Sequence, residues 1–274
     1  MTIQEFLVAA TTHLETAGIE SARLDCLVLL EDALGRDRSS LLASPSEPLP
    51  EKIISKLNTQ IVQRIDHTPL AYIRGKASFY GRYFTVGKGV LVPRPESEAI
   101  ITALVGLRFD PARHDKPIRI ADIGTGSGCL GITAALELHG AHIDLYDTDP
   151  TALTYAATNT KKHRVHATLY SEDLLTHAIH RHYDVLLANL PYVPLDYPIN
   201  KAAMHEPSDA LFAGNDGLDA YRRLWRQVPG IDQKPRYIIT EALESQHAAL
   251  VALAEVAGYR HQHSDGLVQQ FQFI

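Results

Sequence analysis

This chain of 274 residues has few cysteines, no long hydrophobic run and no excess of positive charge. Each of these absences argues against a class of protein. The two cysteines, Cys26 and Cys129, lie far apart in the sequence, and the 14 histidines show no metal-ligand spacing, so we expect neither a disulfide nor a metal site. No stretch approaches the roughly 18 apolar residues of a membrane span, and residues 1–10 do not resemble a signal peptide. We therefore expect a cytoplasmic protein without a membrane partner.

The composition favours an ordinary globular protein and disfavours nucleic acid as the main partner. The chain is 45% hydrophobic and 21% charged, and it is long enough for one large domain and a small one. Its formal net charge is −6, so the protein as a whole is not attracted to a phosphate backbone, although a local basic patch is compatible with that charge.

The first part of the chain carries a helical pattern. A helix is expected after Thr2, which fits a capping box with Glu5. Its apolar positions recur with helical spacing: Ile3, Phe6, Leu7, Ala10 and Leu14. A second helix, capped by Ser21 and ending at Gly35, is predicted to bury Leu24, Leu27, Val28 and Leu34. A third, opening at Pro50, is predicted to bury Ile53, Ile54, Leu57, Ile61 and Ile65.

Strand patterns follow. Alternating aromatic and β-branched residues around Gly81, Gly87 and Gly89 predict a hairpin. From Pro117 onwards, strands alternate with helices, which predicts a parallel sheet covered on both faces. Strands are expected at residues 118–121, 141–146, 167–170, 183–188 and 236–240. A last helix over 246–257 and two short strands, 259–263 and 268–273, predict a terminal antiparallel hairpin.

The stretch IRIADIGTGSGCLGI places Asp122, Gly124, Gly126 and Gly128 between an apolar strand and a helix. Alternate glycines allow a sharp turn and a close approach of the backbone to a ligand. Within it, GSGCLG fits the dinucleotide pattern, so a nicotinamide or flavin enzyme is one alternative. However, an acid ahead of the glycines would repel a pyrophosphate, whereas it could pair with the ammonium group of S-adenosylmethionine. The loop therefore favours S-adenosylmethionine.

Two further acids fit the same ligand. Asp147 ends the second strand, where a carboxylate can accept both hydroxyls of a ribose. Asp173 follows the third strand and could accept from the adenine amine while Leu174 packs on the ring. Parallel strands bring their carboxyl ends to one sheet edge, so these acids are predicted to line one site. For Asp149 we favour a helix cap, because Pro150 suits the first helical position.

The stretch LLANLPYVP is an apolar strand that ends in Asn189-Leu190-Pro191-Tyr192. An amide or aromatic amine is a poor nucleophile because its nitrogen lone pair is delocalised, so its methylation depends on orientation. We expect the Asn189 side-chain oxygen and the Leu190 carbonyl to accept the two N–H groups of such an acceptor. Pro191 disfavours a helical conformation at Leu190 and so presets that carbonyl, while Tyr192 could form a wall against a planar substrate.

The glycine loop and the Asn-x-Pro-Tyr box together resemble class I S-adenosylmethionine-dependent methyltransferases acting on nitrogen. PLAYIRGKASFYGRYFTVGKGVLVPRPESE, residues 69–98, resembles the segment ahead of the catalytic domain in the HemK/PrmC family of release-factor glutamine methyltransferases. RLDCLVLLEDALG, residues 23–35, resembles that family's N-terminal helical domain, and HEPSDALFAGNDGLDAYRRL, residues 205–224, the segment after its catalytic box. The family methylates the glutamine side-chain amide in the Gly-Gly-Gln motif of peptide chain release factors, with S-adenosylhomocysteine as the other product.

The resemblance implies a Rossmann-like class I methyltransferase domain, with a mostly parallel seven-stranded sheet that ends in an antiparallel hairpin. It implies a helical substrate-recognition domain over residues 1–74, a β-hairpin connector over 75–93 and the methyltransferase domain over 94–274. The implied cofactor-binding residues are Asp122, Gly124, Thr125, Gly126, Gly128, Asp147, Asp173, Leu174 and Asn189. The implied catalytic residues are Asn189, Leu190, Pro191 and Tyr192. The implied substrate-binding residues are Asn189, Leu190, Tyr192, Arg94 and Glu206. For Arg94 and Glu98, a salt bridge that braces the loop is an equal alternative.

The chain departs from the family pattern at three places. Leu190 replaces the first proline of the usual Asn-Pro-Pro-Tyr, which costs roughly 0.4 to 1 kcal/mol of preorganisation but keeps the carbonyl. Glu241 is followed by Ala242-Leu243 where the family often has His-Gly, and residues 263–273 lack the usual arginine. These differences indicate a divergent member of the family.

Other functions compete with this interpretation. Adenine-dimethylating rRNA methyltransferases also carry leucine in the box, so an adenine N-methyltransferase acting on rRNA or DNA, with the base stacked on Tyr192, is one alternative. A ribosomal-protein glutamine methyltransferase is a second. A binding protein that has lost catalysis is a third, which the retained acidic, glycine and box positions disfavour. The net charge and the N-terminal region favour a release factor.

Overall fold

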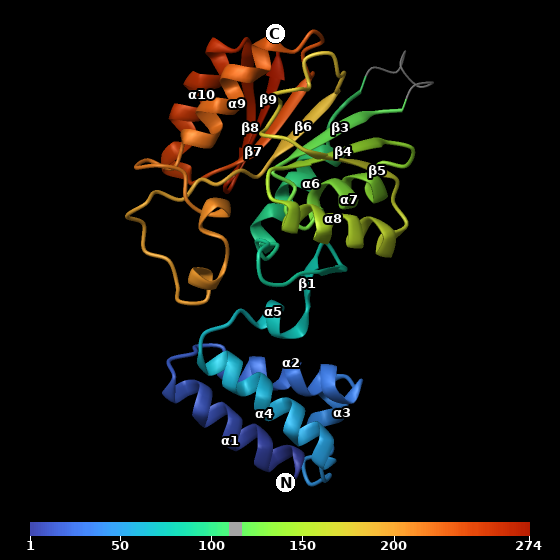
Figure 1. Ribbon diagram of the computed structural model, residues 1–274, viewed down its shortest axis with the longest axis vertical. Helices are drawn as coiled ribbons and strands as arrows, with labels where there is room; N and C mark the ends of the chain where they lie inside the picture. The colour runs from blue at the N-terminus through green and yellow to red at the C-terminus, as the bar shows by residue number, and fades with distance from the viewer. Residues whose placement is uncertain (110–116) are drawn as a thin grey trace. The chain divides into compact units, whose positions relative to one another are not determined.

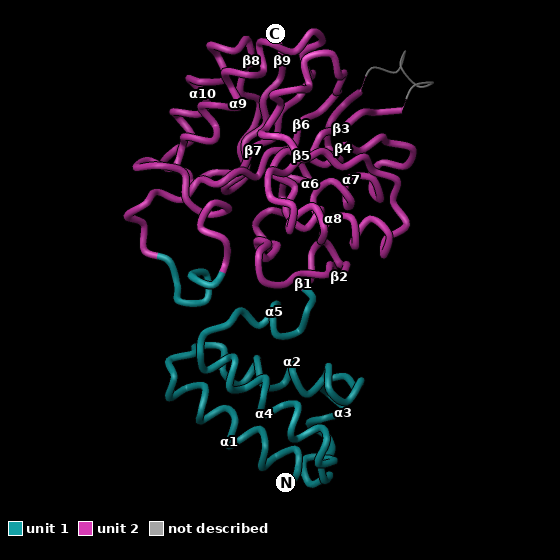
Figure 2. The backbone as a smooth tube through the Cα atoms, viewed as in Figure 1, with its two compact units in different colours: residues 1–76, 199–205 teal, residues 77–198, 206–274 magenta. Residues whose placement is uncertain are grey.

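The computed structural model describes residues 1–109 and 117–274, which fall into two compact units (Figure 1). Unit 1 comprises Met1–Lys76 and Ile199–His205, and unit 2 comprises Ala77–Pro198 and Glu206–Ile274, as the colours in Figure 2 show. The segment Ile199–His205 thus groups with unit 1, although both of its neighbours in the sequence belong to unit 2. Among the described residues, no helix has the length and apolar character needed to cross a membrane.

Unit 1 is helical, with its core between α1, α2 and α4. Its helices are α1 Ile3–Thr16, α2 Ala22–Leu34, α3 Arg38–Leu42, α4 Glu51–Ile65 and α5 Leu70–Arg74. The predicted capping box is confirmed, because the Glu5 amide donates to Thr2 Oγ1 at 3.2 Å and the Thr2 amide donates to Glu5 Oε2 at 2.8 Å. The buried side chains of α1 are the five that the helical spacing predicted.

The predicted buried face of α2 is wrong in part. The core side of the helix carries Cys26, Leu29 and Leu30, while Leu24 is 48% exposed. The apolar side chains of α2 are spread around most of its circumference, so the helical period alone does not determine which face is buried. A buried ion pair fixes it instead, because Asp25 on α2 accepts from Arg64 on α4 at 2.7 Å.

The same ion pair explains a second error, in the helix α4. Ile65 was predicted to be buried and is 38% exposed, whereas Arg64 beside it is buried. A buried charge requires a partner, and Asp25 provides it. The helix therefore turns its charged residue inward at the expense of an isoleucine. Ser21, the predicted cap of α2, makes no side-chain capping bond to any residue that the structure describes.

The predicted hairpin, formed by β1 Lys76–Phe79 and β2 Arg82–Thr85, belongs to unit 2 except for its first residue, Lys76. The two residues between the strands, Tyr80 and Gly81, have φ of 49° and 70°, as a type I′ turn requires. Gly87 lies after the hairpin and not in its turn.

The main sheet of unit 2 has seven strands in the order β5-β4-β3-β6-β7-β9-β8. Their bounds are β3 Arg119–Ile123, β4 His142–Asp147, β5 Ala167–Ser171, β6 Val185–Ala188, β7 Tyr237–Glu241, β8 Tyr259–Asp265 and β9 Val268–Phe273. The first five pair in parallel, and β9 pairs antiparallel with β7 and β8. This confirms the predicted fold class and the terminal hairpin. The strand order reverses at β3 and β6, which is the place where open α/β sheets bind ligands.

Helices cover both faces of this sheet (Figure 1). One face packs against α6 Glu98–Val105, α7 Cys129–Glu137 and α8 Pro150–His163, and the other against α9 Asp219–Gln227 and α10 His247–Val256. The continuous apolar run of β6 follows from this arrangement, because alternate residues enter opposite cores. Short 3₁₀ helices also occur: η1 Pro95–Ser97, η3 Ala203–His205, η4 Ser208–Ala210, η5 Val228–Gly230 and η6 Glu244–Gln246.

Candidate active site

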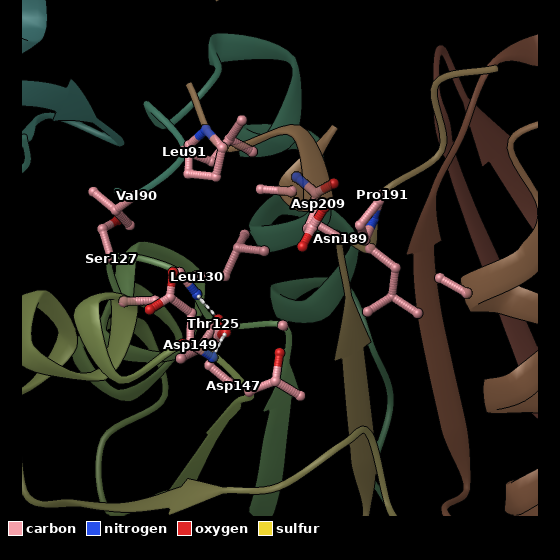
Figure 3. A pocket seen from close by; sticks show the side chains of 18 of the residues that line it. Val90, Leu91, Thr125, Ser127, Leu130, Asp147, Asp149, Asn189, Pro191 and Asp209 are labelled. Carbon is pink, nitrogen blue, oxygen red and sulfur yellow. Dashed lines mark hydrogen bonds between the residues drawn. The ribbon is translucent and has the colours of Figure 1, made fainter. Parts of the chain in front are cut away.

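A cavity of about 500 Å³ lies in unit 2 beyond the carboxyl ends of β3, β4, β5 and β6. This volume lies within the range of small-molecule sites. Figure 3 shows Thr125, Asp147 and Asp149 on one side of it and Asn189 and Pro191 on the other. Of the predicted site residues, those on its wall are Arg94, Gly124, Thr125, Gly126, Asp147, Asp173, Leu174, Asn189, Leu190 and Pro191. Those set back from the wall are Asp122, Gly128, Tyr192 and Glu206.

The glycine loop is shaped by close packing as well as by its backbone conformation. A Cβ atom on Gly124 would lie 3.1 Å from Leu190 Cδ2, and one on Gly128 would lie 2.9 Å from Ile132 Cδ1. Gly126 has φ of 55° and lines the cavity, where a side chain would be strained. Glycine is therefore needed at all three positions, and only Gly126 and Gly124 border the cavity itself.

Asp122 is completely buried behind this loop. Its Oδ2 accepts from Thr125 Oγ1 at 2.6 Å and from the Gly131 amide at 2.9 Å, while its Oδ1 has no hydrogen-bond partner among the described residues. Burial raises the pKa of this carboxyl to about 6 against the opposing effect of those two hydrogen bonds. The structure therefore places Asp122 as a brace of the loop and does not bring it to the cavity wall.

Asp147 does reach the cavity wall, and it also holds the loop in place. Its Oδ2 accepts from the Gly126 amide at 2.8 Å and its Oδ1 from the Asp149 amide at 3.0 Å. Burial raises its pKa. Each carboxylate oxygen keeps a further lone pair for a ligand hydroxyl. Asp149 caps α8 by accepting from the Thr151 amide at 2.7 Å, which confirms the cap that the sequence favoured.

The third acid is held by a residue that the sequence did not point to. Asp173 Oδ1 accepts from Arg223 Nη2 at 3.0 Å, and both side chains are about half exposed. Leu174 is buried and has φ of 53°, a conformation unusual for leucine. Glu172 also lines the cavity and forms a two-pronged ion pair with Arg181. The part of the cavity where Asp173 and Leu174 were predicted to hold adenine thus contains two ion pairs, one of Asp173 and one of Glu172.

The Asn-x-Pro-Tyr box follows β6 and forms the opposite wall. Asn189 Nδ2 donates to Ser97 Oγ at 2.8 Å, which leaves the side-chain oxygen as the end of this amide without a hydrogen-bond partner in the described part of the chain. Leu190 is buried, and its amide donates to the Tyr221 hydroxyl at 3.4 Å, a bond that a proline in this position lacks. The same hydroxyl donates to the Ala188 carbonyl at 2.8 Å. Tyr221, on α9, therefore holds the end of β6 in place.

Tyr192 is fixed at both of its ends. Its hydroxyl donates to Glu241 Oε1 at 2.9 Å, and its carbonyl accepts from Gln246 Nε2 at 2.8 Å. Gly217 allows this arrangement, because a Cβ atom there would collide with the Tyr192 carbonyl. Tyr192 is set back from the cavity, and burial raises its pKa.

The two charged residues assigned to the substrate pair with each other. Arg94 Nη2 donates to Glu206 Oε1 at 2.6 Å, and the Val92 amide donates to Glu206 Oε2 at 2.9 Å. Glu98 instead accepts from the Tyr80 amide at 2.7 Å and so holds the turn of the hairpin. Glu206 is thus the residue that braces the segment before η1, and Arg94 reaches the cavity from it.

Sequence reasoning missed several residues that hold the site. They are Ser97, Asn159, Tyr221, Glu241 and Gln246. Asn159 is completely buried and donates to the Ser127 carbonyl at 2.8 Å, which ties α8 to the glycine loop. Ser97 lies in PRPESE, residues 93–98, at the end of the stretch that resembles the segment ahead of the catalytic domain, and this resemblance is the one signal that could have found it. The described residues contain no group of three or more His, Cys, Asp or Glu that could hold a metal.

Comparison with known proteins gives consistent results for both units. The PrmC N-terminal domain model matches residues 5–75, and the Methyltransferase small domain model matches residues 108–205. The release factor glutamine methyltransferase of Bacillus cereus is 33% identical over 272 residues, which cover 96% of this chain and 93% of that protein. The one from Bacillus subtilis is 32% identical over 254 residues, covering 91% and 88%.

Solved structures support the fold. A methyltransferase from Pyrococcus furiosus superposes with a TM-score of 0.51 at 14% identity, covering 79% of this chain and 96% of that one. The hMettl16 catalytic domain, in complex with MAT2A 3′UTR hairpin 1, superposes with a TM-score of 0.52 at 15% identity, covering 90% and 89%. At these identities the likeness shows the class I methyltransferase fold and not the substrate.

Proposed function

The chain belongs to the release factor glutamine methyltransferase family, and from this premise we propose that it methylates the glutamine of the Gly-Gly-Gln motif in peptide chain release factors. The methyl group is transferred from S-adenosylmethionine to the side-chain amide nitrogen. Support comes from relatives that align over nearly the whole length of both proteins, including the N-terminal region that matches its own family model. These relatives disfavour adenine or a ribosomal protein as the acceptor.

The cavity fits the methyl donor of this family. S-adenosylmethionine supplies an electrophilic methyl carbon on a sulfonium ion. The residues proposed to hold it are Gly124, Thr125, Gly126, Asp147, Asp173, Leu174 and Asn189. Gly126 presents bare backbone to the cavity, and Asp147 and Asp173 place carboxylates on its wall, which suits a ligand with cationic groups and hydroxyls. Asp122 and Gly128 act from behind by holding the loop in shape.

The observation that carries the proposal is the orientation of Asn189. Its Nδ2 is occupied by Ser97, so its Oδ1 is left to accept from an acceptor N–H. We assign the second N–H of the glutamine amide to the Leu190 carbonyl and the position of that carbonyl to Pro191. Two such acceptors direct the nitrogen lone pair at the methyl carbon for in-line displacement, and no strong base is needed because the proton becomes acidic as the bond forms.

The remaining parts are given supporting roles in the proposal. Residues 1–74 form the substrate-recognition domain, residues 75–93 the connector and residues 94–274 the catalytic domain. Tyr192 supports the box from behind the cavity, through Glu241 and Gln246, and Arg94 and Glu206 shape the segment beside it. Release factors act in the cytoplasm, where we place the enzyme.

Mass spectrometry decides the acceptor. The purified protein is incubated with S-adenosylmethionine carrying a deuterated methyl group and with three acceptors in separate reactions: release factor, ribosomal protein and rRNA. The proposal expects the label on the Gly-Gly-Gln glutamine only. A label on adenine, or on a ribosomal-protein glutamine with none on the release factor, would overturn it.

A further inference from the structure

Two strand ends that lie side by side carry Asn189 and a buried acid. The parallel register pairs Ala188 of β6 with Thr240 of β7, so the next residues along these strands are Asn189 and Glu241. Glu241 is 1% exposed and does not line the cavity. The reaction proposed above gives this acid no role, although it lies next to the residue that orients the acceptor.

The carboxyl group of Glu241 gathers hydrogen-bond donors from the active site. Tyr192 donates its hydroxyl to Oε1 at 2.9 Å. Oε2 is buried and has no hydrogen-bond partner among the residues that the structure describes. The side chains of Ser97 and Asn189 nevertheless lie close enough to lower the pKa of this carboxyl against the effect of its burial. Glu241 therefore accepts from Tyr192 and lies close to Ser97 and Asn189.

Ser97 connects Asn189 to this acid. Ser97 is buried, and its oxygen accepts from Asn189 Nδ2 at 2.8 Å. A hydroxyl has a single proton to donate, and a carboxylate can only accept. With its oxygen already accepting from Asn189, Ser97 has its proton available for Glu241. If Ser97 turned that proton to Glu241, a directed series would form, from Asn189 to Ser97 and from Ser97 to Glu241.

We propose that Glu241 is a positioning residue whose carboxylate, acting through Ser97, keeps the amide of Asn189 with Nδ2 turned inward and Oδ1 turned toward the methyl acceptor. An asparagine amide can rotate by half a turn and exchange its oxygen and nitrogen at little steric cost. If Ser97 donated its proton to Asn189 instead, the asparagine NH₂ group would face the N–H groups of the acceptor. A carboxylate at the end of the series prevents this reversal. The inference rests on the proposed role of Asn189.

The charge state of Glu241 follows from the groups that face it. Those groups are Tyr192 after β6, Tyr221 on α9, Cys129 on α7, and Glu96 and Ser97 in η1. Burial and the charge of Glu96 raise the pKa of Glu241, and the hydrogen-bonding side chains lower it, with a net rise. Methyl transfer should therefore weaken on the acid side, at a higher pH than a solvated glutamate would give.

The test compares Glu241→Gln with the wild-type enzyme in kcat, in KM for the acceptor and in Kd for S-adenosylmethionine. Glutamine can donate to Ser97 and so permits the reversed series. We expect kcat to fall at least tenfold with the cofactor Kd within twofold, and the acid limb of the kcat profile to disappear. Unchanged kcat with an unchanged acid limb would overturn the inference.

Ser97 provides the matched variants. Ser97→Ala interrupts the series, so we expect it to lose as much kcat as Glu241→Gln, and the double variant to lose no more than either single one. Ser97→Thr retains the hydroxyl and should restore most of kcat. If the two losses multiply in the double variant, the residues act separately and the inference fails. If Glu241→Gln does not fold, the question is decided by Ser97→Ala and Ser97→Thr, from their kcat values and from the acid side of their pH profiles.

These outcomes are distinct from failure of the proposed function. All rates are measured on the acceptor that the wild-type enzyme labels, whether that is glutamine or adenine, because either nitrogen needs an acceptor oxygen at Asn189. A label on adenine would remove the proposed substrate and still leave the role of Glu241 to be decided by its variants.

Discussion

The two walls of the cavity are held in different ways. We call Thr125, Gly126 and Asp147 the loop wall and Asn189 and Leu190 the box wall. On the loop wall, the Gly126 amide donates to Asp147, 21 residues away in the chain. On the box wall, side chains from distant segments hold the residues, with Asn189 bonded to a serine 92 residues away. The residues that hold the loop wall are thus closer together in the chain than Asn189 and the serine that holds it on the box wall.

The sharpest test of this comparison is Asn189→Ala. It removes an acceptor oxygen from the box wall and leaves the loop wall intact, so we expect kcat to fall by about a hundredfold or more. The Kd for S-adenosylmethionine, measured by calorimetry, should change much less than kcat. Asn215→Ala, at an exposed position of the same unit, is the matched control. A large rise in cofactor Kd with kcat preserved would show that the box wall binds the cofactor and does not orient the acceptor.

A second prediction concerns the stability of the loop wall. The pKa of Asp122 is raised from 3.8 to about 6, so the folded protein binds a proton over a pH range in which the unfolded chain does not. The free energy of unfolding that this group contributes is therefore greatest below pH 3.8 and declines as the pH rises through about 6. Between pH 4.5 and 7.5, the expected decline is about 2 kcal/mol.

Asp122→Asn removes that titration and can keep both hydrogen bonds through its remaining oxygen. We expect the variant to gain stability relative to the wild-type protein as the pH rises from 4.5 to 7.5, by about 2 kcal/mol. Urea unfolding at the two pH values, without cofactor, measures it. Asp265→Asn, at the exposed last residue of β8, is the control. An equal change in both variants would mean that Asp122 is not the cause.

The counterpart of the first prediction lies on the loop wall. Asp147→Ala removes two acceptors from backbone amides, those of Gly126 and Asp149. Hydrogen bonds to a charged group contribute about 1.5 to 3 kcal/mol each, so the cofactor Kd should rise about tenfold or more. The value of kcat at saturating cofactor should remain within a few-fold, since the box wall is unchanged. A fall in kcat as large as that of Asn189→Ala would contradict the division between the walls.

The smallest effect is expected at Leu190. Leu190→Pro restores the family's usual box and gives up the 3.4 Å hydrogen bond from the Leu190 amide to Tyr221. A long neutral hydrogen bond is weak, and the added proline restricts the backbone, so the two effects oppose each other. We expect kcat to change by less than about fivefold, measured with release factor as the acceptor. A hundredfold loss would show that the Tyr221 bond has replaced the proline in fixing the box.

Local patterns predicted much of this molecule because they depend on neighbours in the chain. The capping box of Thr2 and Glu5 uses backbone groups within one turn, and the stripe on α1 follows from a single period. The helical period did not predict the buried face of α2, because apolar side chains lie around most of that helix. There the ion pair of Asp25 with Arg64, from another helix, fixes which face is buried.

The sequence by itself determined the strand and helix order, the glycine conformations of the loop and the polar ending of β6. Each of these depends on the chemistry of a few consecutive residues. Only the tertiary structure decided that Asp122 is set back from the cavity, that Glu206 pairs with Arg94, and that Ser97 fixes the free end of Asn189. The reason is physical: a hydrogen bond between residues far apart in the chain has no spacing by which a sequence could reveal it.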